Sequence, residues 1–135
     1  MVWAMRLGLQ VGFLSARSSA ATAQRAAQLG VTLLHQGVAS KLETYDQIAD
    51  SLLLDDDQIA YMGDDVLDLP VLTRVGLATA PADAADEVRT RVHWVSQRRG
   101  GDGAARELIE TILRAQDRWD SIVATYLAEA QDSQP

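Results

Sequence analysis

The acidic turn Gly63-Asp-Asp-Val-Leu-Asp68 carries the clearest chemical signal in the sequence, and it directly follows an apolar run. Glycine allows the backbone to turn sharply at the end of a strand. Two adjacent carboxylates, with a third one helical turn further on, suit a hard cation such as Mg²⁺, which binds few protein oxygens and keeps several waters. Asp64, Asp65 and Asp68 are therefore candidate metal residues. The alternative is a helix N-terminus whose acids cap the backbone, which is a common arrangement.

Two other polar positions suit a phosphate group. Ser15 offers a hydroxyl, and the N–H groups from Ala16 onward are expected to open a helix and face phosphate oxygens. Lys41 can neutralise a phosphate and nearby carboxylates. Lys41 is also the single lysine among twelve basic residues, which favours a compact, mobile ammonium at this position. Taken alone, plain helix capping is the simpler interpretation of Ser15, and a solvated helix start is the simpler interpretation of Lys41.

The elements that must position these clusters are short apolar runs that alternate with amphipathic segments. Predicted strands cover residues 11–14, 31–35, 59–62, 77–79 and 92–95. Predicted helices cover residues 18–29, 40–54, 68–75 with Asp68 as its cap, 83–90 and 104–127. This alternation predicts a parallel sheet with right-handed crossovers. Sites in such sheets lie at the carboxyl ends of the strands, and each polar cluster follows a predicted strand.

The composition fits one domain. The chain has 135 residues, 47% of them hydrophobic, so residues 1–130 are expected to form a single domain followed by a polar tail, 131–135. The net charge of −7 argues against a nucleic-acid or anionic-membrane surface as partner. The lack of cysteine excludes disulfides, and His35 and His93 share no ligand spacing. The sequence shows no segment long and apolar enough to span a bilayer, so a cytoplasmic location is expected.

In their order along the chain, Ser15, Lys41 and Asp64-Asp65 resemble the site of the haloacid dehalogenase (HAD) superfamily of phosphatases. More narrowly, the chain resembles the 3-deoxy-D-manno-octulosonate 8-phosphate phosphatase family over residues 7–119. The Gly63-Asp-Asp stretch marks the superfamily, and Gly100-Gly-Asp-Gly-Ala-Ala-Arg-Glu107 points to the family within it. The matching stretches are residues 11–19, 28–30, 35–37, 41, 59–71, 75–77 and 100–107.

The resemblance implies a role for each candidate residue. Ser15 would hydrogen-bond the phosphate, and Lys41 would hold both the phosphate and the charge of a nucleophile. Asp64 would ligate Mg²⁺, the implied cofactor, while Asp65 and Asp68 would support the metal and Lys41. The implied reaction is the hydrolysis of a sugar-acid phosphate.

Further implied features concern the rim of the site. Arg17 would lie near the sugar acid, and Ala16 stands where the family usually has glycine but still offers its N–H to the phosphate. Members of the family are commonly tetramers, so a homo-oligomer is expected. The Gly100–Glu107 segment, with Arg106, could then close over a neighbour's site. An ordinary loop before a helix is the alternative interpretation of Gly100–Gly103.

The sequence departs from the family in one essential part. Family members begin with a strand that ends in Asp-x-Asp-Gly-Val, in which the first aspartate attacks phosphorus and the second is general acid and base. No such motif stands ahead of Ser15. Asp55-Asp56-Asp57 is no substitute, because the next strand begins at Ile59 and leaves no room for a crossover. The expected fold class is therefore α/β, a HAD-like (Rossmann-like) parallel sheet flanked by helices that lacks its first central strand, with unpaired edges on two strands.

Three functions are compatible with these residues. The first is a Mg²⁺-dependent sugar-acid phosphatase, inactive as this chain alone because the nucleophile is absent. The second is a non-catalytic module that binds Mg²⁺, a phosphorylated ligand or sister subunits. The third, a receiver-like signalling domain, ranks low because such domains usually place the acids first and the lysine last, whereas Lys41 here precedes Asp64.

Overall fold

The computed structural model describes residues 8–16, 18–29, 31 and 33–132, in which parallel strands alternate with helices. The strands are β1 (Gly12–Leu14), β2 (Leu33–His35), β3 (Ala60–Met62), β4 (Leu77–Ala80) and β5 (Trp94–Val95). The α-helices are α2 (Ala20–Leu29), α3 (Lys41–Ser51), α4 (Leu69–Leu72), α5 (Asp86–Arg89), α6 (Ala104–Ala115) and α7 (Trp119–Asp132). Two short 3₁₀ helices, η1 (Asp56–Gln58) and η2 (Val66–Asp68), flank β3. The predicted α/β class and the order of the five predicted strands are confirmed.

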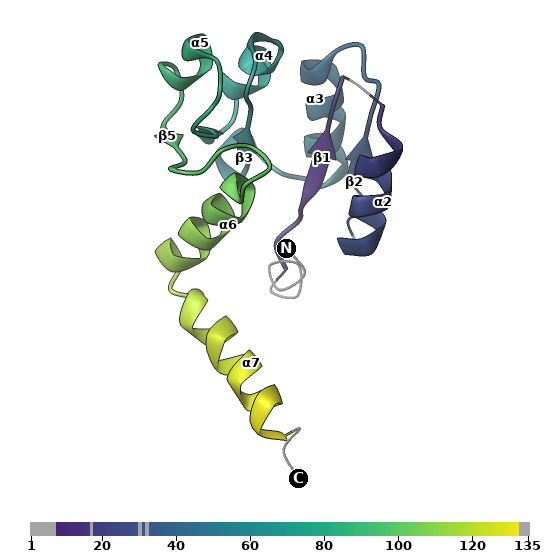
Figure 1. Cartoon of the computed structure of the whole chain (residues 1–135). Helices are drawn as coiled ribbons and strands as arrows, with labels where there is room; N and C mark the ends of the chain where they lie inside the picture. The colour runs from purple at the N-terminus through teal and green to yellow at the C-terminus, as the bar shows by residue number, and fades with distance from the viewer. Residues whose placement is uncertain (1–7, 17, 30, 32, 133–135) are drawn as a thin grey trace.

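The strands form two separate parallel sheets within the described residues. β1 pairs with β2, and β3, β4 and β5 pair in that order. β1 and β3 therefore each have one paired and one unpaired edge, and both strands lie in the middle of the molecule (Figure 1). In the part of the chain that the structure describes, β2 and β5 are the other two edge strands, so the expected unpaired edges are present and only β4 is paired on both sides.

The main hydrophobic core surrounds β4, where residues from α3, α4 and α5 meet. Tyr45 of α3 packs with Leu72 of α4, and Val71 and Val88 are fully buried in the same cluster. Three of the four residues of β4 are buried. Parallel strands covered on both faces are apolar along their whole length, which is the pattern of Leu77-Ala-Thr-Ala80 apart from its threonine. This core holds β3 and β4 in place, and the acidic turn follows β3.

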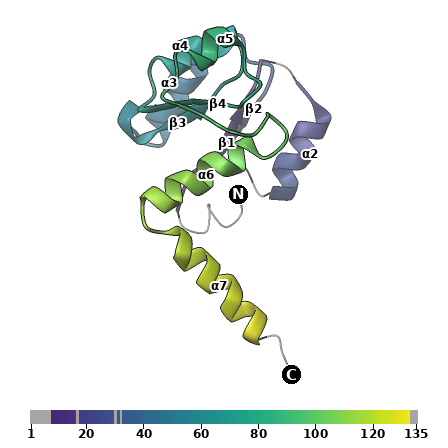
Figure 2. The ribbon, with the colours of Figure 1, turned by 60° about the vertical axis from the view of Figure 1, so that its left-hand side comes forward.

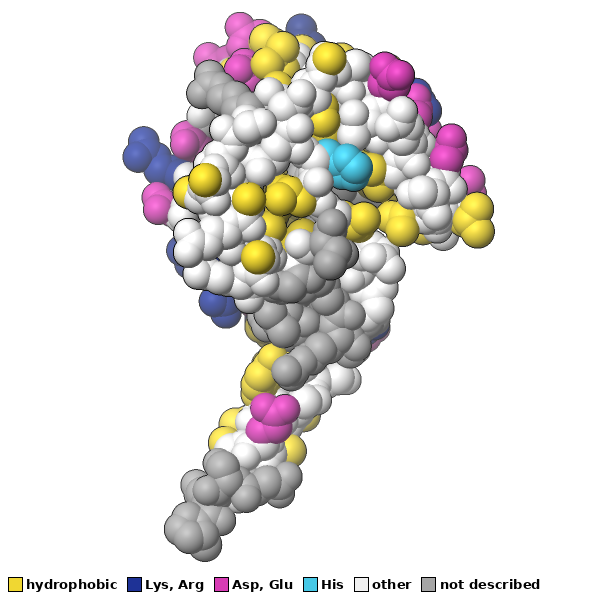
Figure 3. Space-filling view, turned by 90° about the vertical axis from the view of Figure 1, so that its right-hand side faces the viewer, with side chains coloured by type: hydrophobic (Ala, Val, Ile, Leu, Met, Phe, Trp, Pro, Cys, Tyr) yellow, Lys and Arg dark blue, Asp and Glu magenta, His cyan; other side chains and the backbone are white. Residues whose placement is uncertain are grey.

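The β1–β2 sheet is much less covered. Gly12 is exposed, and the other residues of β1 and β2 are only half-buried. Figure 3 shows the side of the molecule that carries α2 and β2, with hydrophobic side chains reaching the surface. These two strands are held mainly by each other, through the register that pairs Phe13 with Leu34.

The prediction of one helix over residues 104–127 is wrong, because the chain has two helices there that separate at Asp117. Asp117 has a φ of 57°, a left-handed conformation that aspartate adopts more readily than most residues. Arg118 N–H bonds to Leu113 C=O (2.8 Å) and Asp117 N–H bonds to Arg114 C=O (3.0 Å), which is the Schellman pattern that ends a helix. The chain turns there, and α7 extends away from the sheets (Figure 2).

Other helix ends also differ from the sequence-based boundaries. Serine side chains cap the starts of α2 and α3, because Ser19 Oγ accepts from Thr22 N–H (3.3 Å) and Ser40 Oγ accepts from Glu43 N–H (3.2 Å). α3 ends at Ser51 rather than Leu54, and α4 and α5 have four residues each. Among the helices of the described residues, none combines the length and apolar character that crossing a membrane requires.

Candidate functional site

A cavity of about 280 Å³ lies at the carboxyl ends of β1 and β3. Ser15 follows β1, Asp64 follows β3, and Lys41 is the first residue of α3. The three polar clusters of the sequence therefore meet in one place, as expected for parallel strands whose ends face the same way. The cavity is lined by Leu14, Ser15, Lys41, Tyr61, Met62, Gly63, Asp64, Asp68, Pro81 and Gly100.

The carboxylate of Asp68 has more hydrogen-bond partners than its neighbours at the cavity, and the residue is only 2% exposed. Its Oδ1 accepts hydrogen bonds from Lys41 Nζ (2.6 Å) and Tyr61 Oη (2.7 Å). Its Oδ2 accepts from the backbone N–H groups of Asp64 (2.9 Å) and Asp65 (3.2 Å). A carboxylate offers about four acceptor sites, so these four donors occupy all of them.

This network corrects the prediction that Asp68 caps α4. The side chain of Asp68 makes no capping bond to that helix. It turns back instead and closes the acidic turn that precedes it, through Asp64 N–H and Asp65 N–H. At the start of η2 the capping is shared: Asp65 Oδ1 accepts from Val66 N–H (2.7 Å), and the side chain of Asp68 accepts from Asp65 N–H in return.

Burial, hydrogen bonds and charges at the cavity together shift the pKa values of three groups. Burial alone would raise the pKa of Asp68, but the hydrogen bonds from Lys41 and Tyr61 outweigh burial and hold that pKa below its ordinary value. Burial, and then the charge of Asp68, raise the pKa of the Tyr61 hydroxyl, which remains a donor. Desolvation, and then the charge of Asp68, raise the pKa of Asp64. A carboxylate with a raised pKa is stabilised in its charged form by a nearby cation.

Gly63 is required by the close approach of the acidic turn to Asp68. A Cβ atom at Gly63 would lie 2.5 Å from Asp68 Cβ, a distance that real side chains do not reach. Gly63 N–H also continues the pairing of β3 by bonding to Thr79 C=O (3.0 Å). The glycine therefore lets the strand stay paired while Asp68 packs directly against the backbone of the turn.

Ser15 is half-buried and is held by β2 and the loop after it. Its N–H bonds to His35 C=O (2.8 Å), and its C=O accepts from Val38 N–H (3.2 Å). The helix expected after Ser15 begins at Ala20, next to its predicted start at Ser18 or Ser19, so Ala16 lies ahead of it in the loop. Ala16 is exposed and is not among the residues that line the cavity, and the predicted rim residue Arg17 lies outside the described residues.

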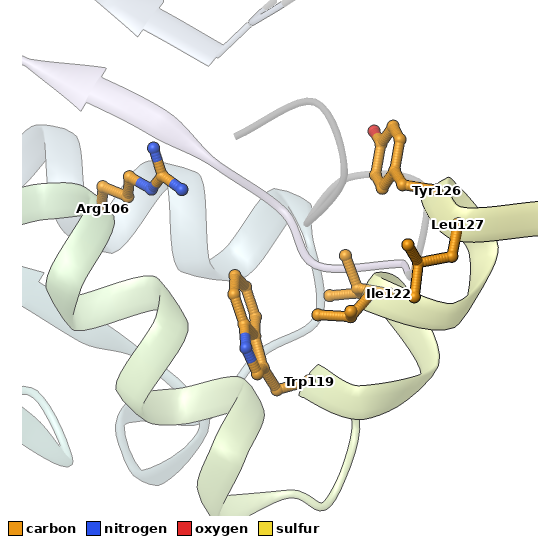
Figure 4. A pocket seen from close by; sticks show the side chains of 6 residues that line it. Arg106, Trp119, Ile122, Tyr126 and Leu127 are labelled. Atoms are coloured by element: carbon orange, nitrogen blue, oxygen red, sulfur yellow. The ribbon is translucent and has the colours of Figure 1, made fainter. Parts of the chain in front are cut away.

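Arg106 is not brought to this cavity in the described chain. It is exposed on α6 and borders a second cavity of about 380 Å³, between α6 and α7 (Figure 4). That cavity is larger but chemically plain, since Arg106 is its only charged lining residue among those described and the others are aromatic or aliphatic. From the Gly100–Glu107 segment it is Gly100 that reaches the first cavity, where its N–H bonds to Asp83 Oδ1 (2.8 Å).

The Asp55-Asp56-Asp57 loop lies at the other end of β3. It precedes the strand, whereas the cavity follows it. Asp56 accepts from Tyr45 Oη (2.6 Å) and Arg74 Nε (3.3 Å), so it ties α3 to the end of α4. These contacts agree with the interpretation that this loop does not provide a nucleophile.

Within the described residues, no group of three histidine, cysteine or acidic side chains is arranged to hold a metal ion. Asp64 and Asp68 are the carboxylates that line the cavity, and the acceptor sites of Asp68 are occupied. Mg²⁺ often binds protein through one or two carboxylates and fills its other positions with water and phosphate. The cavity suits Mg²⁺ in that sense, with Asp64 as the available carboxylate.

Tyr61 is the functional candidate that the sequence interpretation missed. Within Ile59-Ala-Tyr-Met62 it has the pattern of an ordinary core residue of a strand. Its hydroxyl instead reaches Asp68, which lies seven positions further on. The hydroxyl group of Tyr61 is the one sequence feature that could have indicated a role in the site, since a buried tyrosine hydroxyl usually has a hydrogen-bond partner.

The fold is α/β, with a polar cavity at the carboxyl ends of β1 and β3, and sequence comparison agrees with this class. The profile of the haloacid dehalogenase-like hydrolases matches residues 7–108, so the chain belongs to that family. Within it, the chain is 39% identical over 110 residues to 3-deoxy-D-manno-octulosonate 8-phosphate phosphatase from Yersinia pestis, covering 82% of this chain and 59% of that protein. The chain thus spans about six tenths of the length of this relative and of its Escherichia coli counterpart.

Solved structures give the same result. The Yersinia pestis enzyme superposes with a TM-score of 0.84 at 36% identity, over 88% of this chain and 65% of that one. The corresponding phosphatase from Moraxella catarrhalis, crystallised with a magnesium ion, a phosphate ion and a KDO molecule, superposes with a TM-score of 0.88 at 30% identity, over 93% of this chain and 72% of that one. The predicted HAD-like fold and family are confirmed by these similarities.

Proposed function

We propose that this chain provides the phosphate-binding and magnesium-binding part of a phosphatase that acts on a sugar-acid phosphate of the 3-deoxy-D-manno-octulosonate 8-phosphate type, in the cytoplasm. The observation that carries the proposal is the single cavity shared by Ser15, Lys41 and Asp64. Family membership supports the hydrolase class. The magnesium, phosphate and KDO in the Moraxella catarrhalis relative support the choice of ligands.

Each residue has a task that follows from its chemistry. The Lys41 ammonium neutralises phosphate charge as a compact point charge, and Asp68 keeps it at the cavity wall. Ser15 follows β1 and faces the cavity from the side opposite β3, so its hydroxyl can hydrogen-bond a phosphate oxygen there. Mg²⁺ held through Asp64, with Asp65 alongside it, would supply positive charge at the transferring phosphoryl group.

The aspartate nucleophile of the proposed reaction must come from elsewhere. Of the carboxylates that line the cavity among the described residues, Asp68 is enclosed by four donors and Asp64 is assigned to the metal. Among the described residues, β1 and β3 each keep an unpaired edge, and the residues that follow both strands line the cavity. We therefore assign the nucleophile to an added strand between β1 and β3, and expect little activity from these 135 residues alone.

Phosphate release from 3-deoxy-D-manno-octulosonate 8-phosphate with Mg²⁺ tests the proposal. The comparison uses this chain and a chain extended at its N-terminus by a hydrophobic-Asp-x-Asp-Gly segment, each with and without Lys41→Ala. We expect turnover only from the extended chain, and a loss of about 10²–10³-fold on Lys41→Ala, as for removal of one charge-stabilising group. Turnover by the 135-residue chain that disappears in Lys41→Ala would show that one of its own acids is the nucleophile.

A non-catalytic binding module is the second candidate, and the completed network around Asp68 favours it because that network needs no further group. Such a module binds Mg²⁺, a phosphorylated ligand or sister subunits. Calorimetry with Mg²⁺ and inorganic phosphate would then show binding, while the extended chain would show no turnover.

We also propose a homo-oligomer, a tetramer as in the family, in which Arg106 meets a neighbour's site. Light scattering of the wild type and Arg106→Ala tests that contact.

A further inference from the structure

The wall of the cavity contains a hydroxyl group to which the proposed function gives no task. Tyr61 Oη and Lys41 Nζ donate to the same atom, Asp68 Oδ1, at 2.7 Å and 2.6 Å. The other oxygen, Asp68 Oδ2, is held by two backbone N–H groups. The carboxylate can therefore neither rotate nor shift without losing bonds, and the ammonium and the hydroxyl share its one remaining oxygen.

Tyr61 is a rigid donor, in contrast to Lys41. Its backbone belongs to β3, where it pairs in register with Ala78, and its C=O accepts from the buried Thr79 Oγ1 (2.9 Å). A tyrosine ring on such a strand has only two side-chain torsions. Lys41 has a flexible four-carbon stem and an ammonium with three rotatable donors, so its place at the cavity depends on the acceptor that it finds.

We propose that the hydroxyl of Tyr61 positions Lys41 through Asp68: by occupying one side of Oδ1, it fixes the direction from which the ammonium bonds and directs its other N–H groups into the cavity. Tyr61 is a positioning residue, because its hydroxyl contacts Asp68 and acts on Lys41 through it. The inference rests on the proposed function for its purpose, phosphate binding, but the positioning itself is measurable without a substrate.

The sequence offers a direct probe, since Lys41 is its single lysine among twelve basic residues. Isotope-labelled lysine therefore gives one side-chain signal in a magnetic resonance spectrum, and its relaxation reports the mobility of the ammonium end. Tyr61→Phe removes only the hydroxyl. We expect the Lys41 side chain to become more mobile, and its affinity for inorganic phosphate to fall by about threefold to tenfold, as for weakening one hydrogen bond to a charged group.

Tyr45→Phe is the matched control. Tyr45 is buried, and its hydroxyl, like that of Tyr61, donates to an aspartate. The acceptor is Asp56 Oδ1 at 2.6 Å, which lies at the other end of β3. A loss of stability common to both variants would be structural, and only Tyr61→Phe is expected to change the Lys41 signal. An unchanged Lys41 mobility in a folded Tyr61→Phe variant would overturn the proposal.

Asp68→Asn supplies a second, independent arm. If Tyr61 acts through Asp68, then adding Tyr61→Phe to Asp68→Asn should change the Lys41 signal less than Tyr61→Phe does in the wild type. Fully additive effects would contradict a shared route. A Lys41 signal that changes in Tyr61→Phe but does not respond to phosphate would support the positioning role of Tyr61 and contradict the proposed phosphate site. The positioning role and the proposed function can therefore be refuted independently.

Discussion

The two sheets of this protein differ in how far they are stabilised by their own residues. The β3–β4–β5 sheet has β4 at its centre, three of whose four residues are buried, and fully buried side chains from α4 and α5 pack against it. In the β1–β2 sheet, Gly12 is exposed and the remaining strand residues are only half-buried. One sheet has a hydrophobic core of its own, whereas the other is a pair of strands with one helix.

The functional groups are divided in the same way. Asp64, Asp68 and Tyr61 come from the β3 side, and Lys41 joins them because α3 packs into the core around β4 through Tyr45. Ser15 is the one polar candidate that β1 brings to the cavity. The residues proposed to hold the metal, and Lys41, therefore belong to the better-packed half, whereas the hydroxyl proposed to bind phosphate, that of Ser15, belongs to the less covered half.

The comparison also explains why the unpaired edges matter. An exposed strand edge presents backbone groups that can pair with another chain. In the part of the chain that the structure describes, β1 and β3 each have such an edge, and their carboxyl ends border the same cavity. A strand placed between them would join the two sheets, cover the half-buried residues of β1 and complete the site in one step.

Truncation of one leucine in each half should give the largest difference. Leu72 is 4% exposed in the core around β4, so Leu72→Ala should cost about 2–5 kcal/mol in the free energy of unfolding. Leu34 of β2 is only half-buried, so Leu34→Ala should cost about 1 kcal/mol. Urea unfolding measures both values. Equal costs would mean that the two sheets are equally packed in solution.

Glycine replacement at the acidic turn should have the next largest effect. Gly63→Ala places a Cβ 2.5 Å from Asp68 Cβ, and the strain should cost about 1–3 kcal/mol in unfolding free energy. It should also displace Lys41, because Asp68 holds its ammonium. Gly100→Ala is the control at the same cavity, since the nearest atom to its Cβ would be Asp83 Oδ1 at 3.6 Å, an ordinary contact. A neutral Gly63→Ala would contradict the close packing of the turn.

Much of this arrangement is predictable from the sequence, because it depends on local patterns. Apolar runs indicate all five strands, and the polar residues after them indicate Ser15, Lys41 and Asp64 at one edge. The parallel order of strands then brings residues together that are far apart in the chain. Serine caps at the starts of α2 and α3 are equally local signals.

The parts that escape prediction depend on tertiary contacts. The apolar face continues past residue 117, so periodicity alone does not reveal that Asp117 ends α6. Asp68 has the sequence pattern of a helix cap, but Lys41 and Tyr61 compete for its side chain from two other elements. Tyr61 itself is indistinguishable from a core residue until β3 and the acidic turn are placed together in space.

Loss of one buried hydrogen bond should have a smaller effect. Thr79 is fully buried, and its hydroxyl donates to Tyr61 C=O (2.9 Å), so Thr79→Val should cost about 1 kcal/mol in unfolding free energy. Thr22 is a half-buried residue of α2 in the less covered half, and Thr22→Val should be close to neutral because threonine and valine have similar helix propensities. Thermal unfolding of both variants tests this. A larger loss at Thr22 would reverse the order of the two halves.

The smallest expected effect is a change in the pH dependence of stability at Asp56, at the far end of β3. The hydrogen bond from Tyr45, and then that from Arg74, hold the pKa of Asp56 below its ordinary value despite partial desolvation. Its contribution to stability is therefore fully present above the pKa of the unfolded carboxyl, about 3.9, and is lost as the pH falls through the lower folded value. Asp56→Asn should flatten the acid limb of the stability curve and leave its neutral region nearly parallel to that of the wild type. Asp50→Asn is the control, because Asp50 is an exposed acid on the surface of α3. An acid limb that keeps its slope in Asp56→Asn would mean that the hydrogen bond from Tyr45 to Asp56 does not contribute to the stability of the fold.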